Sequence, residues 1–136
     1  MEKTVINSPL GFVCIEGDSS GISKISVTSE EKELSETIPE LFSEVVTQLK
    51  EYFEGNRTEF QFEMNPKGTD FQKKVWQELL KIPYGKTESY QKITNKIGDP
   101  KAIRAVANAN GKNPLWIVIP CHRVIGSDGS LTGYAG

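Results

Sequence analysis

The segment IPCHRVIG, residues 119–126, places the chain's single histidine directly after one of its two cysteines. A cysteine becomes a nucleophile when its thiolate is favoured, which requires cationic or hydrogen-bond-donating neighbours. His122 and Arg123 stand beside Cys121 in this role. Successive side chains in an extended segment point apart, so we expect the imidazole to reach the thiol through a turn, restricted by Pro120, or through a bridging water.

The rest of the cysteine and histidine content narrows the kinds of site. Free cysteine is often a small buried hydrophobe and a lone histidine often a structural residue, so the pair alone leaves a purely structural interpretation open. Cys14, in GFVCIEG, is expected in the core of a strand. With two cysteines, one histidine and no CxxC motif, we expect no disulfide, no metal and no cofactor.

The charge distribution divides the chain near Pro66. Residues 1–65 carry five Lys and Arg against thirteen Asp and Glu, a net charge of -8, whereas residues 66–136 carry eleven against five, a net charge of +6. Such asymmetry favours a second half that faces a polyanion such as nucleic acid. The alternative is an uneven distribution of ordinary solvated charges.

The first half has the pattern of a small α/β domain, predicted to span 1–64. Alternating β-branched residues and glycines in the first thirty residues predict two or three antiparallel strands. PELFSEVVTQLKEYFEG, from Pro39 to Gly55, has the apolar spacing of a helix. TEFQFEM, residues 58–64, alternates like a further strand, and NPKG at 65–68 is the expected linker.

The second half, 65–136, has the pattern of a helix-turn-helix domain. Thr69 and Gln72 have capping-box spacing before a first amphipathic helix. SYQKITNKIG and DPKAIRAVANANG predict two helices joined by a very short turn, with Asp99 capping the second. A tight turn at Asp128-Gly129 predicts a following hairpin and hence a winged helix. An ordinary alanine-rich packing helix is the alternative for DPKAIRAVANANG.

Four motifs in this half give the chain a family resemblance. They are Arg104-Ala105-Val106, Asn113-Pro114, Ile119 to Ile125 (IPCHRVI) and Gly133 to Gly136 (GYAG). In this order they resemble the methylated-DNA–protein-cysteine methyltransferases, which repair O6-alkylguanine. The resemblance implies an α+β protein with a ribonuclease H-like N-terminal domain and a C-terminal winged-helix domain.

The resemblance also implies roles for individual residues. Cys121 would accept the alkyl group, once per molecule, from O6-alkylguanine and also from O4-alkylthymine. His122 would act through a water to help Cys121 lose its proton. Tyr90 would rotate the target phosphate and assist protonation of the leaving guanine, and Asn113 would be the hinge between the second helix and an active-site strand. Arg104 would enter the duplex in place of a flipped base.

The remaining implied positions fall into two groups. Residues expected to contact DNA beside Arg104 and Tyr90 are Lys101, Ala105, Asn110 and Arg123. Residues expected to line the alkyl pocket are Trp116, Val124, Tyr134 and Ala135. The implied partner is double-stranded DNA containing O6-alkylguanine. We expect a monomer in the cytoplasm. We expect no membrane contact, because no apolar run is long enough to cross a bilayer.

One departure from the family pattern keeps two other functions open. The family continues beyond GYAG to a helix whose glutamate orients the histidine, and this sequence ends at Gly136. Without that acid we expect a poorer nucleophile. A protein that binds alkylguanine without accepting the alkyl group is therefore the main alternative. A cysteine-histidine hydrolase is the third, disfavoured by the basic helix-turn-helix.

Overall fold

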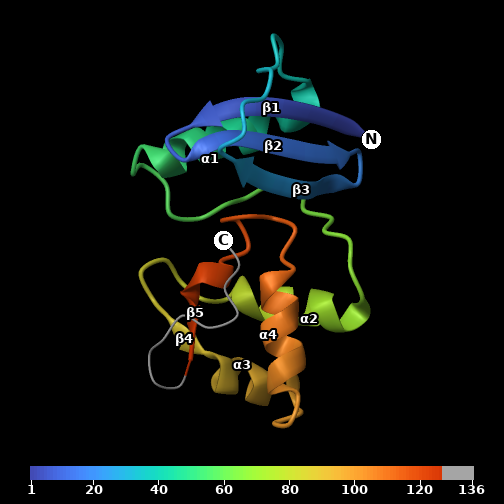
Figure 1. Cartoon of the computed structure of the whole chain (residues 1–136), viewed down its shortest axis with the longest axis vertical. Coiled ribbons are helices and arrows are strands. Elements are labelled where there is room, and N and C mark those ends of the chain that lie inside the picture. Colours follow the sequence, from blue (N-terminus) through green and yellow to red (C-terminus); the bar gives the residue numbers. More distant parts are fainter. Residues whose placement is uncertain (127–136) are drawn as a thin grey trace. The chain divides into compact units, whose positions relative to one another are not determined.

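The computed structural model describes residues 1–126 and divides into two compact units, Met1–Pro66 and Lys67–Gly136 (Figure 1). The predicted linker at 65–68 contains the point of division. Among the described residues, no helix has the length and apolar character needed to cross a membrane.

The N-terminal unit contains a three-stranded antiparallel sheet in the order β1-β2-β3: β1 (Glu2–Ser8), β2 (Gly11–Asp18) and β3 (Gly21–Thr28). Val13 and Ile15 of β2 are fully buried on one face of the sheet. Cys14 lies between them on the other face and is half-buried. Its predicted place in a strand is confirmed, but its predicted place in the core is wrong, because neighbouring strand residues face opposite sides.

A helix covers one face of this sheet (Figure 1). A 3-10 turn, Glu40–Phe42, leads into α1 (Ser43–Phe53). Phe42 of the 3-10 turn and Leu49 of α1 are fully buried. The apolar spacing read from the sequence therefore marks the side of α1 that the sheet covers.

The predicted strand at 58–64 is mostly absent. Only Met64 pairs with the sheet, through a parallel bridge to Ile22. The buried side chain of Gln48, on α1, takes the place of a neighbouring strand for Gln61. Its Nε2 donates to the Gln61 carbonyl at 2.8 Å, and the Gln61 N–H donates to its Oε1 at 2.8 Å. Because a side chain satisfies this backbone, no β-ladder is needed there.

The C-terminal unit packs three helices around an apolar core. They are α2 (Asp70–Leu79), α3 (Tyr90–Ile97) and α4 (Ile103–Gly111). Val75, Ile93 and Val106, one from each helix, are at most 1% exposed. The predicted capping box of Thr69 and Gln72 is confirmed, with reciprocal hydrogen bonds of 3.1 and 2.9 Å.

The short turn between α3 and α4 gives the predicted helix-turn-helix, although α4 begins later than predicted. Gly98 ends α3 with a left-handed φ of 102°. Asp99 then forms a turn of its own, accepting from the Lys101 N–H on its side chain at 3.0 Å and from the Ala102 N–H on its backbone at 3.0 Å. Asp99 therefore caps this turn, and α4 starts at Ile103.

Two very short strands complete the unit. β4 (Glu88–Ser89) immediately precedes α3 and pairs in parallel with β5 (Val124–Ile125), which immediately follows Cys121–Arg123. This pairing fixes the start of α3 beside the PCHR segment. The hairpin predicted at Asp128-Gly129 lies outside the described residues.

Gly68 leaves room for the Trp76 side chain, which connects α2 to α4. The indole N–H of Trp76 donates to the buried Ala109 carbonyl at 2.9 Å. A Cβ on Gly68 would lie 2.5 Å from the Trp76 ring and 2.7 Å from the Gln72 Oε1. We expect Gly68→Ala to lower the free energy of unfolding by about 1–3 kcal/mol, because it displaces the indole and the capping box together. Chemical denaturation measures this loss.

A matched control is Lys67→Ala, at an exposed neighbouring position outside these contacts. Its denaturation midpoint is expected to equal that of the wild type. If Gly68→Ala also unfolded at the wild-type midpoint, the packing of the Trp76 ring on this backbone would not contribute to stability.

Candidate active site

Cys121 opens a 3-10 turn, Cys121–Arg123, directly before β5. Pro120 lies at φ -81° and ψ 65°, and the Cys121 N–H donates back to the Ile119 carbonyl at 2.8 Å. The turn predicted from Pro120 is therefore present, as an inverse γ-turn centred on this residue. It leaves Cys121 and His122 half-buried on consecutive positions of the turn.

The segment before Cys121 is a series of turns, so the predicted active-site strand is wrong. Ile117 has a φ of 67°, and the Val118 N–H donates to the Trp116 carbonyl at 2.8 Å, a γ-turn of the strained kind. Asn113 closes the segment: its Nδ2 donates to the Ile119 carbonyl at 2.7 Å, and its Oδ1 accepts from the Leu115 N–H at 2.9 Å.

Asn113 therefore connects the end of α4 to the residue two positions before the thiol. This geometry is compatible with the hinge that the sequence predicts, although the segment it closes is a loop.

Burial governs the protonation of the two reactive groups. It raises the pKa of the Cys121 thiol above the ordinary value of 9.0, and a side-chain hydrogen bond from Asn113 opposes this rise without cancelling it. Burial, helped by the charge of Arg123, lowers the pKa of His122 below 6.5. At neutral pH the site thus holds a protonated thiol and a neutral imidazole, which is an acceptor for the thiol proton.

Tyr90, at the start of α3, lies near the thiol and is 4% exposed. Burial raises the pKa of its hydroxyl, a hydrogen bond from Asn110 partly opposes this, and the charge of a Cys121 thiolate raises it further. A tyrosine that keeps its proton near a nucleophile can donate it.

Asn110 is 1% exposed and lies on the inner side of α4. Its Nδ2 donates to the Tyr90 hydroxyl oxygen at 2.9 Å and to the Cys121 carbonyl at 3.4 Å. A side chain this deeply buried does not contact DNA, so that prediction for Asn110 is wrong. The repeated alanine-asparagine pattern of α4 gave no means of separating its inner asparagine from its outer one, Asn108.

The other side of α4 is exposed and basic. Arg104 and Ala105 are exposed in its first turn, and Lys101 is exposed in the turn before it. Among the described residues, Arg104 makes no ion pair and no side-chain hydrogen bond. Because Ala105 is small and the Arg104 guanidinium has no partner among the described residues, a polyanion can approach this face of α4.

Arg123 has a structural contact that the sequence did not indicate. Its guanidinium donates to the Ile82 carbonyl at 2.8 Å and lies 5.6 Å from the centre of the Tyr84 ring. It therefore attaches the Cys121–Arg123 turn to the segment after α2. Its predicted DNA contact stays a prediction, to be made by its remaining N–H groups.

The predicted alkyl pocket is only partly within the described residues. Val124 is 1% exposed and Trp116 is half-buried. Tyr134 and Ala135 lie outside the part of the chain that the structure describes. The pocket therefore stays a prediction.

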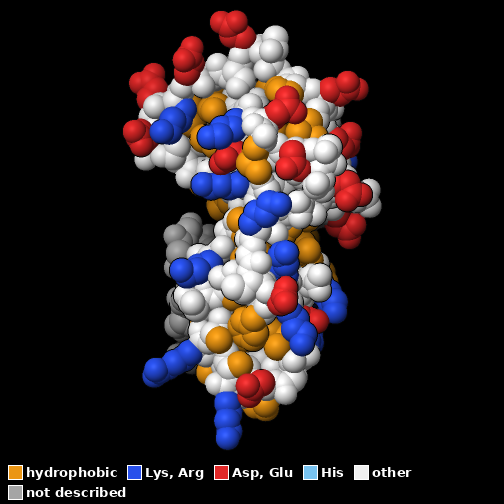
Figure 2. Space-filling model, turned by 90° about the vertical axis from the view of Figure 1, so that its right-hand side faces the viewer, with side chains coloured by type: hydrophobic (Ala, Val, Ile, Leu, Met, Phe, Trp, Pro, Cys, Tyr) orange, Lys and Arg blue, Asp and Glu red, His pale blue; other side chains and the backbone are white. Residues whose placement is uncertain are grey.

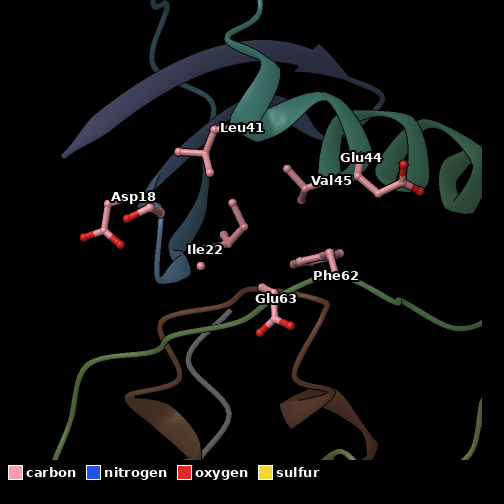
Figure 3. Close-up of a pocket in the computed structure, with 9 residues that line it drawn as sticks. Asp18, Ile22, Leu41, Glu44, Val45, Phe62 and Glu63 are labelled. Atoms are coloured by element: carbon pink, nitrogen blue, oxygen red, sulfur yellow. The ribbon is translucent and has the colours of Figure 1, made fainter.

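Two further surface features bear on the choice of site. On the face drawn in Figure 2, Asp and Glu side chains gather over the N-terminal unit, and Lys and Arg are prominent on the C-terminal unit. The N-terminal unit also has a hollow of about 300 Å³ (Figure 3). Its lining holds three carboxylates, of Asp18, Glu44 and Glu63, but no cysteine, histidine, lysine or arginine. It therefore has no nucleophile of the kind present at Cys121.

No group of three or more histidine, cysteine or carboxylate side chains is placed to hold a metal ion within residues 1–126. The site is thus a helix-turn-helix domain that carries a half-buried thiol beside a neutral imidazole and a protonated phenol. Its class is a helix-turn-helix domain with a candidate cysteine nucleophile.

Comparison with known proteins matches both units to one family. The model of the 6-O-methylguanine DNA methyltransferase ribonuclease-like domain matches residues 1–66, and the model of the DNA-binding domain of that family matches residues 70–136. The chain is 48% identical over 135 residues to a methylated-DNA–protein-cysteine methyltransferase of Mycobacterium tuberculosis, covering 96% of this chain and 82% of the relative. It is 45% identical over 142 residues to one of Methanosarcina barkeri, covering 99% and 89%.

Solved structures agree with this match. The crystal structure of the M. tuberculosis O6-methylguanine methyltransferase has a TM-score of 0.85 and 47% identity, covering 99% of this chain and 84% of that one. The M. tuberculosis OGT structure in complex with DNA has a TM-score of 0.86 and 46% identity, covering 98% and 84%. The chain belongs to the 6-O-methylguanine DNA methyltransferase family. The predicted family is confirmed, and so is the predicted α+β class with a ribonuclease-like N-terminal domain and a C-terminal DNA-binding domain.

Proposed function

We propose that this protein repairs O6-alkylguanine in double-stranded DNA by transferring the alkyl group to Cys121, once per molecule. The observation that carries the proposal is the thiol itself: Cys121 opens a half-buried turn next to Tyr90, inside the domain that matches a DNA-binding family model. The relatives named above are methylated-DNA–protein-cysteine methyltransferases, and one close structural relative was solved with DNA.

The proposed chemistry is a single displacement at carbon. Neutral His122, acting through a water, takes the thiol proton, and the Cys121 sulfur attacks the alkyl carbon. The carbon–oxygen bond breaks with its electron pair going to the guanine oxygen, and Tyr90 donates a proton to the leaving base. The product is a thioether, a bond that His122 and Tyr90 do not cleave, so the protein is consumed.

The proposed DNA binding uses α4 and base flipping. The alkyl carbon is buried in the duplex, so the nucleotide must leave the stack at a cost of a few kcal/mol. Exposed Arg104 would occupy the vacated space, and Lys101 would contact phosphates. A wing formed beyond residue 126 would complete a winged helix. One chain supplies all these groups, so a monomer suffices.

Stoichiometry tests the proposal. A duplex with one O6-methylguanine is titrated with protein, digested to nucleosides and analysed for the remaining lesion. We expect the lesion to disappear linearly and completely at one equivalent of protein, with guanine appearing in equal amount. Multiple turnover would indicate a hydrolase, and an unchanged lesion would exclude transfer.

A damage-binding function without transfer is the second candidate. It is supported by the raised pKa of Cys121, which leaves little thiolate at neutral pH. In that case the titration would leave the lesion intact, while the duplex would bind more tightly with the lesion than without it.

The pH dependence of transfer reports the role of His122. Since burial lowers the pKa of His122 below 6.5 and raises that of Cys121 above 9.0, a neutral base and a protonated thiol coexist between these values. We expect the single-turnover rate at saturating duplex to be flat from pH 6.5 to 9 and to fall at lower pH, as the imidazole becomes protonated.

The variant His122→Ala removes the internal base. Its rate is expected to be lower at neutral pH and to rise about tenfold per pH unit, because the thiol must then ionise on its own. A wild-type rate that rose with the same slope would show that His122 does not assist the thiol. Duplex affinity, measured at each pH, is the control.

A further inference from the structure

One buried amide connects the DNA-facing helix to both reactive residues of the site. Asn110 lies in the last turn of α4, and its Nδ2 donates to the Tyr90 hydroxyl oxygen at 2.9 Å and to the Cys121 carbonyl at 3.4 Å. Asn110 and Tyr90 are 1% and 4% exposed, so solvent does not compete with these bonds.

The orientation of this amide follows from its partners. The Cys121 carbonyl oxygen can only accept, so the NH₂ end of Asn110 must face it; the reversed amide would place two oxygens 3.4 Å apart. The same NH₂ group then donates to the Tyr90 hydroxyl oxygen. A phenol that accepts on its oxygen must direct its own hydrogen elsewhere, so Asn110 restricts the directions in which Tyr90 can donate.

Packing alone does not account for an asparagine here. The Asn110 Oδ1 is buried and has no hydrogen-bond partner among the described residues. Burying this oxygen without a partner costs free energy, a cost that an apolar side chain at the same position would not carry. The hydrogen bond from Asn110 also opposes the effect of burial on the pKa of Tyr90, which keeps the phenol a better acid than burial alone would.

We propose that Asn110 is a positioning residue for alkyl transfer: its amide aims the Tyr90 hydroxyl at the leaving base and ties the end of α4 to the backbone of the nucleophile. The inference rests on the proposed function, in which Tyr90 is the proton donor. Docking of α4 on DNA would thereby fix the proton donor and the nucleophile through one side chain.

The test is a double-mutant cycle on single-turnover methyl transfer at saturating O6-methylguanine duplex. Asn110→Leu removes both hydrogen bonds and keeps the number of heavy side-chain atoms. Asn56→Leu is the matched control, at an exposed position of the N-terminal unit. We expect Asn110→Leu to slow transfer about tenfold or more and Asn56→Leu less than about twofold, with both variants folded by circular dichroism.

The cycle is completed in the Tyr90→Phe background. There the phenol oxygen is gone, so Asn110→Leu is expected to slow transfer by less than about threefold further. Equal fold-losses in the two backgrounds would overturn the proposal, because Asn110 would then not act through Tyr90.

A readout that needs no transfer separates this inference from the proposed function. The ¹³Cζ resonance of Tyr90 in labelled protein responds to a hydrogen bond on its oxygen. We expect Asn110→Leu to shift that resonance and Asn56→Leu to leave it in place. If the wild type transferred no methyl group, the proposed function would fail. An unmoved resonance in Asn110→Leu would overturn the positioning role whether or not transfer occurs.

Discussion

Replacing Cys121 by alanine is expected to abolish methyl uptake, a loss of at least about a thousandfold in the transfer rate. The chain's other cysteine, Cys14, lies on a strand of the N-terminal unit and is not expected to accept the methyl group. The turn itself should persist, since the backbone N–H of Cys121 and its carbonyl, not its sulfur, hold it to Ile119 and Asn110. Affinity for a methylated duplex is therefore expected to change less than about twofold. Single-turnover transfer and fluorescence anisotropy measure the two quantities.

Cys14→Ala is the matched control, because it removes the other thiol from a half-buried position. It is expected to transfer at the wild-type rate. Methyl uptake by Cys121→Ala would place the acceptor elsewhere. A collapse of duplex binding in the same variant would make Cys121 a structural residue.

The second large effect is expected for Arg104→Ala. The flipped state of the duplex costs a few kcal/mol, part of which Arg104 would offset by occupying the vacated space. If its share is about 2–3 kcal/mol, transfer from duplex slows about 30- to 150-fold. Arg104 is exposed and outside the contacts of the thiol, so reaction with free O6-methylguanine base should stay within about twofold of the wild type.

Lys101→Ala separates flipping from simple charge loss. Lys101 is also exposed and lies in the turn before α4. Its loss should weaken duplex affinity and reduce the salt dependence, while transfer at saturating duplex is retained. Equal losses by Arg104→Ala on the duplex and on the free base would contradict its proposed role in flipping.

The parts of the fold that depend on local pattern could be predicted from the sequence. The capping box, the hairpin-linked strands and the helix-turn-helix all follow from turn residues and apolar spacing within a few positions. The strand predicted at 58–64 was wrong because its alternation is real but Gln48, distant in sequence, satisfies the backbone of Gln61. The late start of α4 has a similar cause, since Asp99 uses its side chain for a separate turn.

The candidate nucleophile could be predicted from the sequence, but the residues that hold it in place could not. The PCHR motif and its resemblance indicated Cys121 and His122. The contacts of Asn110 depend on which side of α4 faces inward, and those of Arg123 depend on the two-residue pairing of β4 with β5. The periodicity of the sequence does not reveal either of these features. An asparagine on a basic helix suggests DNA contact until the structure places it inside.

The most direct test of the central claim is the intact mass of the protein after mixing with a duplex that contains a single O6-methylguanine, followed by peptide mapping. Alkyl transfer to Cys121 predicts a gain of one methyl group that stops at one per chain and maps to the peptide containing Cys121. An unchanged mass with the methylated duplex still bound, or a methyl group on any other residue, would contradict it.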